Sequence, residues 1–129
     1  AYNSKGIGQN KCEVGVWTHP GTDQSVITRI DDFCAQYRWL LVERATNFQS
    51  PDEFAQKAGI SWEEFFRQMN SWNEPSSAFA RAVRTTARAS DLLSADLNCF
   101  YHWATGGDNR VVILDYGYNT EVLQQYYSG

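Results

Sequence analysis

The chain has 129 residues, of which 43% are hydrophobic and 15% aromatic, and its formal net charge is -4. This composition excludes a disordered tail and fits one domain with a hydrophobic core of its own. The net negative charge does not attract the phosphate backbones of nucleic acids, so the composition argues against a nucleic-acid partner.

The three cysteines, Cys12, Cys34 and Cys99, are odd in number and widely spaced. A disulfide framework would be even and denser, so we expect reduced thiols in a cytoplasm. No apolar run reaches the roughly 18 residues that a membrane span needs, so we expect no membrane partner. The chain begins at Ala1 rather than Met, so we expect a processed protein or a fragment of a longer one.

The first third of the chain is predicted to contain a loop and two strands. Residues 1–12 are polar and carry glycines, which indicates a loop. The alternative, a phosphate-binding glycine loop, lacks its third glycine and a preceding strand. Residues 26–30 are β-branched, and residues 37–43 form a continuous apolar run that is typical of a buried strand. We expect these two segments to pair in antiparallel fashion.

The middle of the chain is predicted to be helical. Ser50 and Ser61 each precede a glutamate by three residues, which is the pattern of a capping box, and Pro51 follows the first of them. The first of these helices should end at Gly59. Ser76 can cap a third, longer helix that ends near residue 93. Its buried stripe would consist of Phe79, Ala82, Val83, Thr86 and Ala89.

The end of the chain returns to a strand. Residues 106–109 predict a turn, and residues 110–114 predict a buried strand that ends at Asp115. A last short helix is expected over residues 121–127. Together these elements predict one α+β domain over residues 1–129.

Two acids lie where a fold can position carboxylates rigidly. Asp115 follows the buried strand and is itself followed by Tyr116 and Gly117, while Asp96 lies just past the long helix. The order of helix, loop and strand can place both carboxylates on one side of one cleft. Phosphoryl transfer uses such a pair, because one acid orients the attacking hydroxyl and the other holds Mg²⁺. Taken alone, an acid after a strand is also explained as the cap of a turn.

With these elements in this order, the chain resembles a protein kinase in the compact form of phage-encoded kinase-like proteins. Residues 26–42 resemble the fourth and fifth strands of the kinase N-lobe, and residues 43–45 resemble its hinge. The helices over residues 50–69 and 76–93 resemble αD and αE of the C-lobe. Asp115-Tyr116-Gly117 falls at the metal-binding Asp-Phe-Gly motif.

The resemblance implies roles for six residues. The catalytic residues would be Asp96 and Glu13. The metal ligands would be Asp115 and Asn98. The hinge residues that bind ATP would be Glu43 and Ala45.

The sequence also departs from the kinase pattern. Only twelve residues precede Glu13, which leaves no room for the glycine-rich loop and the lysine that bind ATP phosphates. Tyr101 stands where the catalytic loop of a kinase has asparagine. Only twelve residues follow Gly117, too few for an activation loop. We therefore expect a kinase-like C-lobe with a truncated N-lobe, in which residues 1–45 are a partial N-lobe and hinge and residues 46–129 a reduced C-lobe.

These departures predict a pseudokinase with weak or absent binding of ATP and Mg²⁺. Such a protein would act in a bacterial cytoplasm, or in the host cytoplasm if phage-encoded, by binding another protein. We predict that residues 121–127 contact the protein partner. The alternative, to which we give equal weight, is that these residues cover the core.

Two other functions stay open. One is an active ATP- and Mg²⁺-dependent serine/threonine kinase in a longer form. The other is a helix-turn-helix DNA-binding protein over residues 54–68, where Glu63 and Glu64 would repel phosphates.

Overall fold

The computed structural model describes residues 4–71, 73–92, 103–117 and 119–126. Its architecture is mixed α+β, as the sequence predicts. The elements in chain order are α1 (Ser4–Thr18), a 3-10 turn η1 (Gln24–Val26), β1 (Ile30–Phe33), β2 (Leu40–Val42), β3 (Thr46–Asn47), α2 (Pro51–Ala58), α3 (Trp62–Met69), α4 (Ala78–Ala89), β4 (Trp103–Thr105), a second turn η3 (Gly107–Asn109), β5 (Val111–Ile113) and α6 (Thr120–Tyr126).

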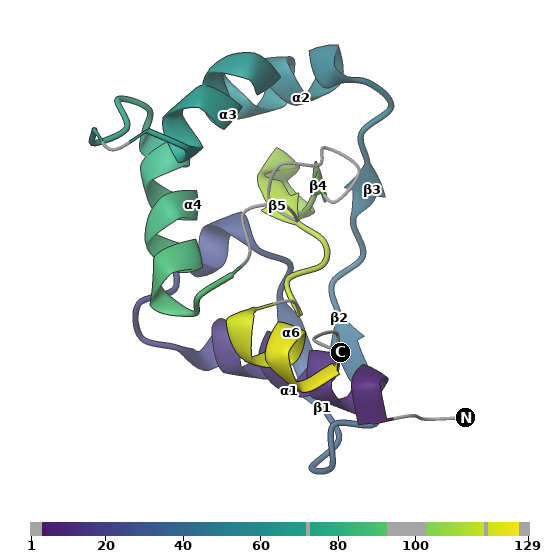
Figure 1. Ribbon diagram of the computed structural model, residues 1–129. Helices are drawn as coiled ribbons and strands as arrows, with labels where there is room; N and C mark the ends of the chain where they lie inside the picture. Colours follow the sequence, from purple (N-terminus) through teal and green to yellow (C-terminus); the bar gives the residue numbers. More distant parts are fainter. Residues whose placement is uncertain (1–3, 72, 93–102, 118, 127–129) are drawn as a thin grey trace.

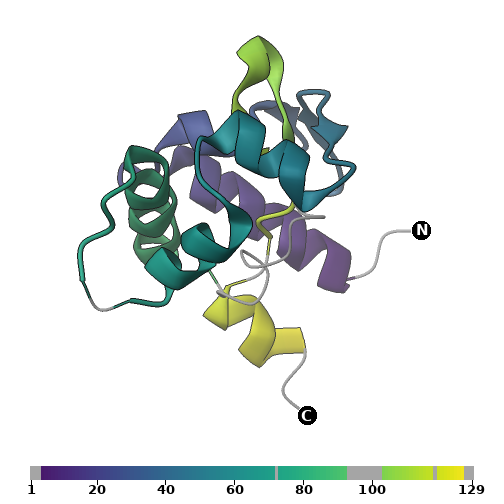
Figure 2. The same ribbon diagram turned by 90° about the horizontal axis from the view of Figure 1, so that it is seen from above.

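Helices cover a small central sheet from two ends (Figure 1). The helices α2 and α3 lie at one end, α1 and α6 pack together at the other, and α4 runs along one side. The view from above places α4 on the same side (Figure 2). None of the helices in the described part of the chain combines the length and the apolarity that crossing a bilayer takes.

The central sheet has the strand order β3-β4-β5, and both of its pairings are antiparallel. The predicted strand over residues 110–114 is confirmed, because β5 lies within it and all three of its residues are buried. Ile27 adds an isolated parallel bridge to Ile113, which joins the N-terminal part of the chain to this sheet.

The predicted antiparallel pair is confirmed as the two-stranded sheet of β1 and β2. Its first strand lies later than expected. Residues 24–26 form η1 instead, because Asp23 caps this turn by accepting a hydrogen bond from the Ser25 amide. We call residues 30–42, which contain both strands and their turn, the β1–β2 ribbon.

The expected burial of the second strand is wrong. The exposed fractions are 45% for Trp39, 56% for Leu41 and 43% for Val42. Arg38 precedes the strand, and Tyr37 adopts the positive φ of 58° in the turn before it. The apolar run therefore forms a strand that is largely exposed, and only Tyr37 and Leu40 pack against the core.

The capping boxes predicted the next two helices correctly. Ser50 accepts a hydrogen bond from the Glu53 amide, and Ser61 accepts one from the Glu64 amide. Gly59 ends α2 with a left-handed φ of 73°, which glycine adopts without strain.

The third helix is shifted from its prediction by one residue at its start. Ser77 rather than Ser76 is the N-cap of α4, and Ser76 accepts a hydrogen bond from Gln68 of α3. The helix ends at Ala89, before the expected end near residue 93.

The predicted loop over residues 1–12 is wrong for its described part, which belongs to helix α1. Three glycines and the absence of an acidic first turn hide this helix from a propensity argument. Packing explains it instead, since Val14 and Val16 are buried and the helix contacts α6 and β1. Tertiary contacts supply most helical stability in a folded domain.

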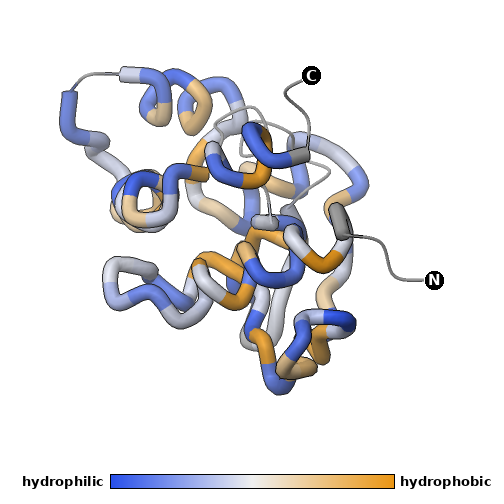
Figure 3. The backbone as a smooth tube through the Cα atoms, turned by 60° about the horizontal axis from the view of Figure 1, so that its bottom comes forward, coloured by the Kyte–Doolittle hydropathy of each residue, from blue (hydrophilic) through white to orange (hydrophobic). Residues whose placement is uncertain are grey.

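Aromatic side chains dominate the core between the helices and the central sheet. The ring of Phe54 lies at the middle of this cluster and is fully buried. Ring centroids 5.2 to 6.1 Å from it belong to Phe48, Trp62, Phe65, Phe79 and Trp103. Hydrophobic and hydrophilic segments alternate along the helices, as an amphipathic pattern requires (Figure 3).

Candidate functional site

Two of the predicted site residues, Glu13 and Asp115, lie together in the fold. Glu13 projects from α1, and Asp115 follows the end of β5, so the contact joins opposite ends of the chain. The carboxyl group of Glu13 shares a hydrogen bond with the carboxyl group of Asp115. The residue Glu13 is half-buried, whereas Asp115 is exposed.

The segment after β5 fits closely against α1. A Cβ atom on Gly117 would lie 2.7 Å from the Gln9 carbonyl oxygen and 3.0 Å from Cγ of Glu13. Only glycine therefore allows this approach. The buried Tyr116 side chain anchors the segment, since its hydroxyl donates a 2.7 Å hydrogen bond to the Thr28 carbonyl. Tyr116 and Gly117, which follow Asp115 in the chain, therefore hold it in place beside α1.

The surroundings of Glu13 favour its protonated form. Burial is the largest cause, and the neighbouring Asp115 charge and hydrogen bond add to it, so the pKa of Glu13 rises to about 8. Near neutral pH Glu13 therefore holds its proton beside the Asp115 carboxyl group. A carboxyl group that titrates close to neutral pH can accept or donate a proton there, which is a property of general acid–base groups.

The other two predicted members of the phosphoryl-transfer site, Asp96 and Asn98, lie outside the described residues. The expected placement of Asp96 beside Asp115 therefore stays a prediction. Over the ranges that the structure describes, no three His, Cys, Asp or Glu side chains are grouped so that they could hold a metal ion.

The predicted hinge residue Glu43 has a different set of contacts. Its side chain is 4% exposed and forms an ion pair with Arg110, the residue before β5. The same carboxylate accepts hydrogen bonds from the backbone amides of Arg29 and Gly107. Glu43 thus links the ribbon to the turn between β4 and β5. Ala45 is half-buried in the segment between β2 and β3.

Sequence reasoning did not find the ion pair between Glu43 and Arg110. The two residues are 67 positions apart, and no local pattern connects them. One available signal was an acid at the end of an apolar run, because a carboxylate in such a place needs a partner when it is buried.

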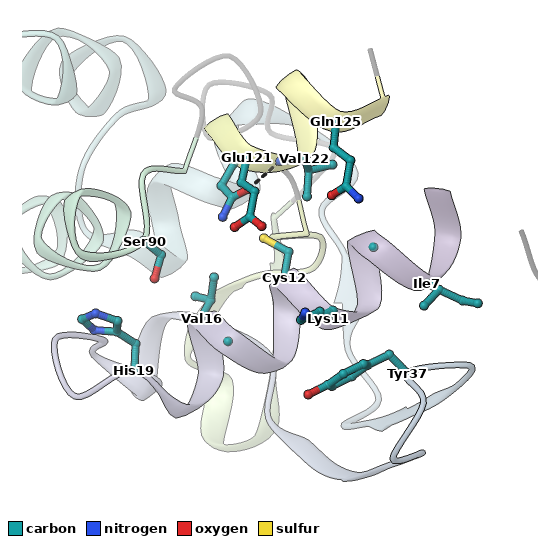
Figure 4. Close-up of a pocket in the computed structure, with 13 residues that line it drawn as sticks. Ile7, Lys11, Cys12, Val16, His19, Tyr37, Ser90, Glu121, Val122 and Gln125 are labelled. Atoms are coloured by element: carbon teal, nitrogen blue, oxygen red, sulfur yellow. Dashed lines mark hydrogen bonds between the residues drawn. The ribbon is translucent and has the colours of Figure 1, made fainter. Parts of the chain in front are cut away.

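A groove with a volume of about 650 Å³ runs between α1 and α6. Figure 4 shows the Cys12 thiol of α1 pointing toward Glu121 of α6. Lys11, His19 and Gln125 supply further polar groups to its walls.

The cysteine in this groove is a poor nucleophile. Burial raises the pKa of Cys12 to about 12, and the charges of Glu13, Glu121 and Asp115 act in the same direction. Thiols react as thiolates, so Cys12 is inert near neutral pH. Cys12 therefore does not supply this groove with an activated nucleophile, although the polar side chains of the walls could still bind a ligand.

The predicted terminal contact, residues 121–127, is partly built into the fold. Val122 is buried, and α6 packs against α1. This placement supports the core alternative for the described part of the segment.

The exposed large hydrophobic side chains gather in one place. Of the five such side chains in the described part of the chain, four belong to the β1–β2 ribbon: Phe33, Trp39, Leu41 and Val42. The fifth, Phe66, lies on α3. The Phe33 ring also stacks on Tyr37 across the turn, with 6.1 Å between the centroids. Clustered exposed apolar side chains mark interaction surfaces, whereas scattered ones are ordinary.

The two helices of the DNA-binding alternative, α2 and α3, do form and pack together. The first turn of α3 carries Glu63 and Glu64, which repel phosphates there. The aromatic side chains Trp62 and Phe65 of the same helix face the core.

The chain matches no family model, no curated protein and no solved structure.

Proposed function

We propose that this chain acts by binding another protein through its β1–β2 ribbon, on a kinase-like scaffold with little or no transferase activity of its own. The observation that supports this function is the cluster of exposed apolar side chains on the ribbon. A protein partner would remove these side chains from water, and aromatic side chains such as Trp39 provide much of the energy in protein interfaces.

The ribbon is anchored well enough to serve as a binding surface. Its last strand leads into Glu43, whose buried carboxylate is held by Arg110 and by two backbone amides. At the same end of the ribbon, Ile30 pairs with Val42 and is buried in the core. At the turn end, the side-chain amide of Asn10 in α1 donates a 2.9 Å hydrogen bond to the Tyr37 carbonyl. A surface held at both ends loses little conformational freedom on binding, which favours affinity.

The experiment compares two exposed apolar side chains of the same molecule. Partners are captured from source cells with wild-type protein, Leu41→Ser and Phe66→Ser as baits, and binding is then repeated with the purified partner. We expect Leu41→Ser to lose the partner at least about tenfold in affinity and Phe66→Ser to keep it. A partner that binds all three baits equally would contradict the proposal.

A second candidate function is phosphoryl transfer by a longer form of the protein. The contact between Glu13 and Asp115 favours it, because the resemblance assigns both residues to one kinase site. In that function Asp115 would hold Mg²⁺, and Asp96 would orient the hydroxyl that attacks the phosphate.

The test of this second function is a transfer assay with radiolabelled ATP and Mg²⁺. Transfer that is lost in both Asp96→Asn and Asp115→Asn would establish it for the form assayed. If the 129-residue chain itself gave such transfer, the proposed lack of activity would be wrong.

A further inference from the structure

We propose that the free edge of β2 binds an extended strand of a different polypeptide, apolar in its middle and acidic at both ends. This inference rests on the proposed function, since it specifies the partner of the same ribbon. Three observations carry it: the direction of the backbone groups of β2, the apolar side chains on both of its faces, and the arginines that flank it.

The backbone groups of β2 point alternately toward β1 and away from it. The Trp39 carbonyl accepts a hydrogen bond from the Cys34 amide, and the Glu43 amide donates one to the Arg29 carbonyl. Both bonds are directed toward β1. In an antiparallel ladder this pattern alternates along the strand, so Leu41 also faces β1.

By the same alternation, Leu40 and Val42 direct their amides and carbonyls to the opposite edge. Within the described ranges, β2 has no strand neighbour other than β1. An unpaired edge of this kind is a template for pairing with another chain.

The side chains of β2 are apolar on both faces. Trp39 and Leu41 lie on one face, and Leu40 and Val42 on the other, because successive side chains of a strand alternate. Exposure is 45% and 56% for the first pair and 43% for Val42, whereas Leu40 is half-buried and packs against the core. A helix or a flat surface docked on the ribbon would cover only one of these faces. An added strand covers both, since its own side chains alternate beside those of β2.

The charges that flank β2 define the ends of the occupant. Arg38 and Arg44 are exposed, and neither forms an ion pair with another described residue. If the chain stays extended between them, they are separated by about 20 Å, at roughly 3.3 Å per residue. A strand of about seven residues with an acid at each end would pair with both.

The same charges argue against a second copy of this chain as the occupant. The antiparallel register that overlaps the whole of β2 with its own copy sets Leu41 opposite Leu41. That register also sets Arg38 opposite Arg44 at both ends of the pairing. Like charges directly across a strand pair are destabilising.

The probe is a seven-residue fluorescent peptide with five apolar residues, alternately valine and alanine, in its middle and an aspartate at each end. A matched peptide carries lysine at both ends. We expect the acidic peptide to bind the wild-type protein with a dissociation constant below about 1 mM, at least about tenfold tighter than the lysine peptide. Binding should be lost in Val42→Pro, which removes the outward amide, and kept in Phe66→Ser.

Hydrogen exchange of the wild-type backbone gives a readout that does not depend on the folding of a variant. Without peptide, the Leu41 amide should exchange slowly, and the Leu40 and Val42 amides fast. Saturating acidic peptide should slow Leu40 and Val42 by at least about tenfold, as new ladder hydrogen bonds form.

Three outcomes would overturn the inference. They are no binding of the acidic peptide up to about 1 mM, binding that leaves the Leu40 and Val42 amides unprotected, and protection of these amides by dimerisation of the protein alone. The proposed function is tested separately, and it fails if Leu41→Ser keeps a purified partner as tightly as the wild-type protein does. If Leu41→Ser loses a purified partner that leaves both amides unprotected, the ribbon binds proteins but not by strand addition.

Discussion

The strands β2 and β5 have similar sequences and opposite surroundings. β5 has the sequence Val-Val-Ile, is paired with β4 and is buried at all three positions. β2 has the sequence Leu-Leu-Val, is paired with β1 and is half-buried or exposed at all three positions. The difference lies in what covers each strand. β5 lies beside α2 and η1, whereas much of the surface of β2 stays open to water.

This comparison separates two roles of an apolar run. In β5 the run stabilises the fold. In β2 a similar composition stays exposed, and we propose that it stabilises a complex. The four predictions that follow test this division, from the largest expected effect to the smallest.

Truncation of the buried strand should destabilise the protein far more than truncation of the exposed one. We expect Ile113→Ala to lower the free energy of unfolding by about 2–5 kcal/mol, because it leaves a cavity at a site that is 1% exposed. Leu41→Ala should lower it by less than about 1 kcal/mol. Urea unfolding measures both, and equal losses would mean that the ribbon belongs to the core.

Removal of the ion pair that links the ribbon to the turn between β4 and β5 should have the next largest effect on the free energy of unfolding. Arg110→Ala leaves the buried carboxylate of Glu43 with only the distant Arg29 guanidinium as an ion-pair partner, and we expect a loss of about 2–3 kcal/mol. The matched variant is Arg29→Ala, whose guanidinium is 51% exposed and lies 3.9 Å from the same carboxylate. It should cost less than about 1 kcal/mol. The reverse order of the two losses would contradict the link described here.

Glu13, which is half-buried beside Asp115, should make stability depend on pH. In the folded state its pKa is about 8 instead of the ordinary 4.5, so the folded protein holds a proton that the unfolded chain releases. The stabilisation is complete below pH 4.5 and is lost as the pH rises through 8. Between pH 5 and pH 6.5 we expect the free energy of unfolding to fall by about 2 kcal/mol.

Glu13→Gln is the variant that tests this pH dependence. It should flatten the curve and stabilise the protein at pH 8, whereas Glu63→Gln, which removes an exposed carboxyl group on α3, should retain the wild-type slope. A wild-type curve that stays level or rises from pH 5 to pH 8 would show that Glu13 is ionised in the folded protein.

The smallest perturbation is the modification of one thiol, either Cys34 in the ribbon turn or Cys12 in the groove between α1 and α6. Hydrogen bonds from the backbone at Arg38 and Gln36 lower the pKa of Cys34 in the ribbon turn, whereas burial raises the pKa of Cys12 to about 12. In a Cys99→Ala background we expect iodoacetamide to modify Cys34 at least about 100-fold faster at pH 7.5. Mass spectrometry of the two peptides over time measures the ratio, and preferential labelling of Cys12 would contradict this placement of α1 and α6.

Local chemistry made part of this fold predictable. The caps at Ser50 and Ser61 predicted two helix starts, because a capping hydrogen bond involves residues only three apart. The helix α1 was missed since its glycines resemble a loop, and its stability comes from packing against distant elements.

Burial and pairing over long distances were the part that the sequence could not supply. The run of residues 37–43 indicated a strand, but its exposure depends on the elements that surround it. Asp115 was identified by its place after a buried strand and Glu13 through the kinase resemblance, and their contact follows only from the fold. The ion pair between Glu43 and Arg110 has the same origin, because two distant positions meet only when the ribbon and the central sheet are assembled.

The most direct test of the central claim is the ratio of two dissociation constants for one purified partner, measured by calorimetry. Leu41→Ser and Phe66→Ser each remove an exposed apolar side chain, with exposures of 56% and 44% in the wild-type protein. If the ribbon is the binding surface, the dissociation constant rises at least about tenfold for Leu41→Ser and less than about twofold for Phe66→Ser. Equal dissociation constants for the two variants would contradict the claim.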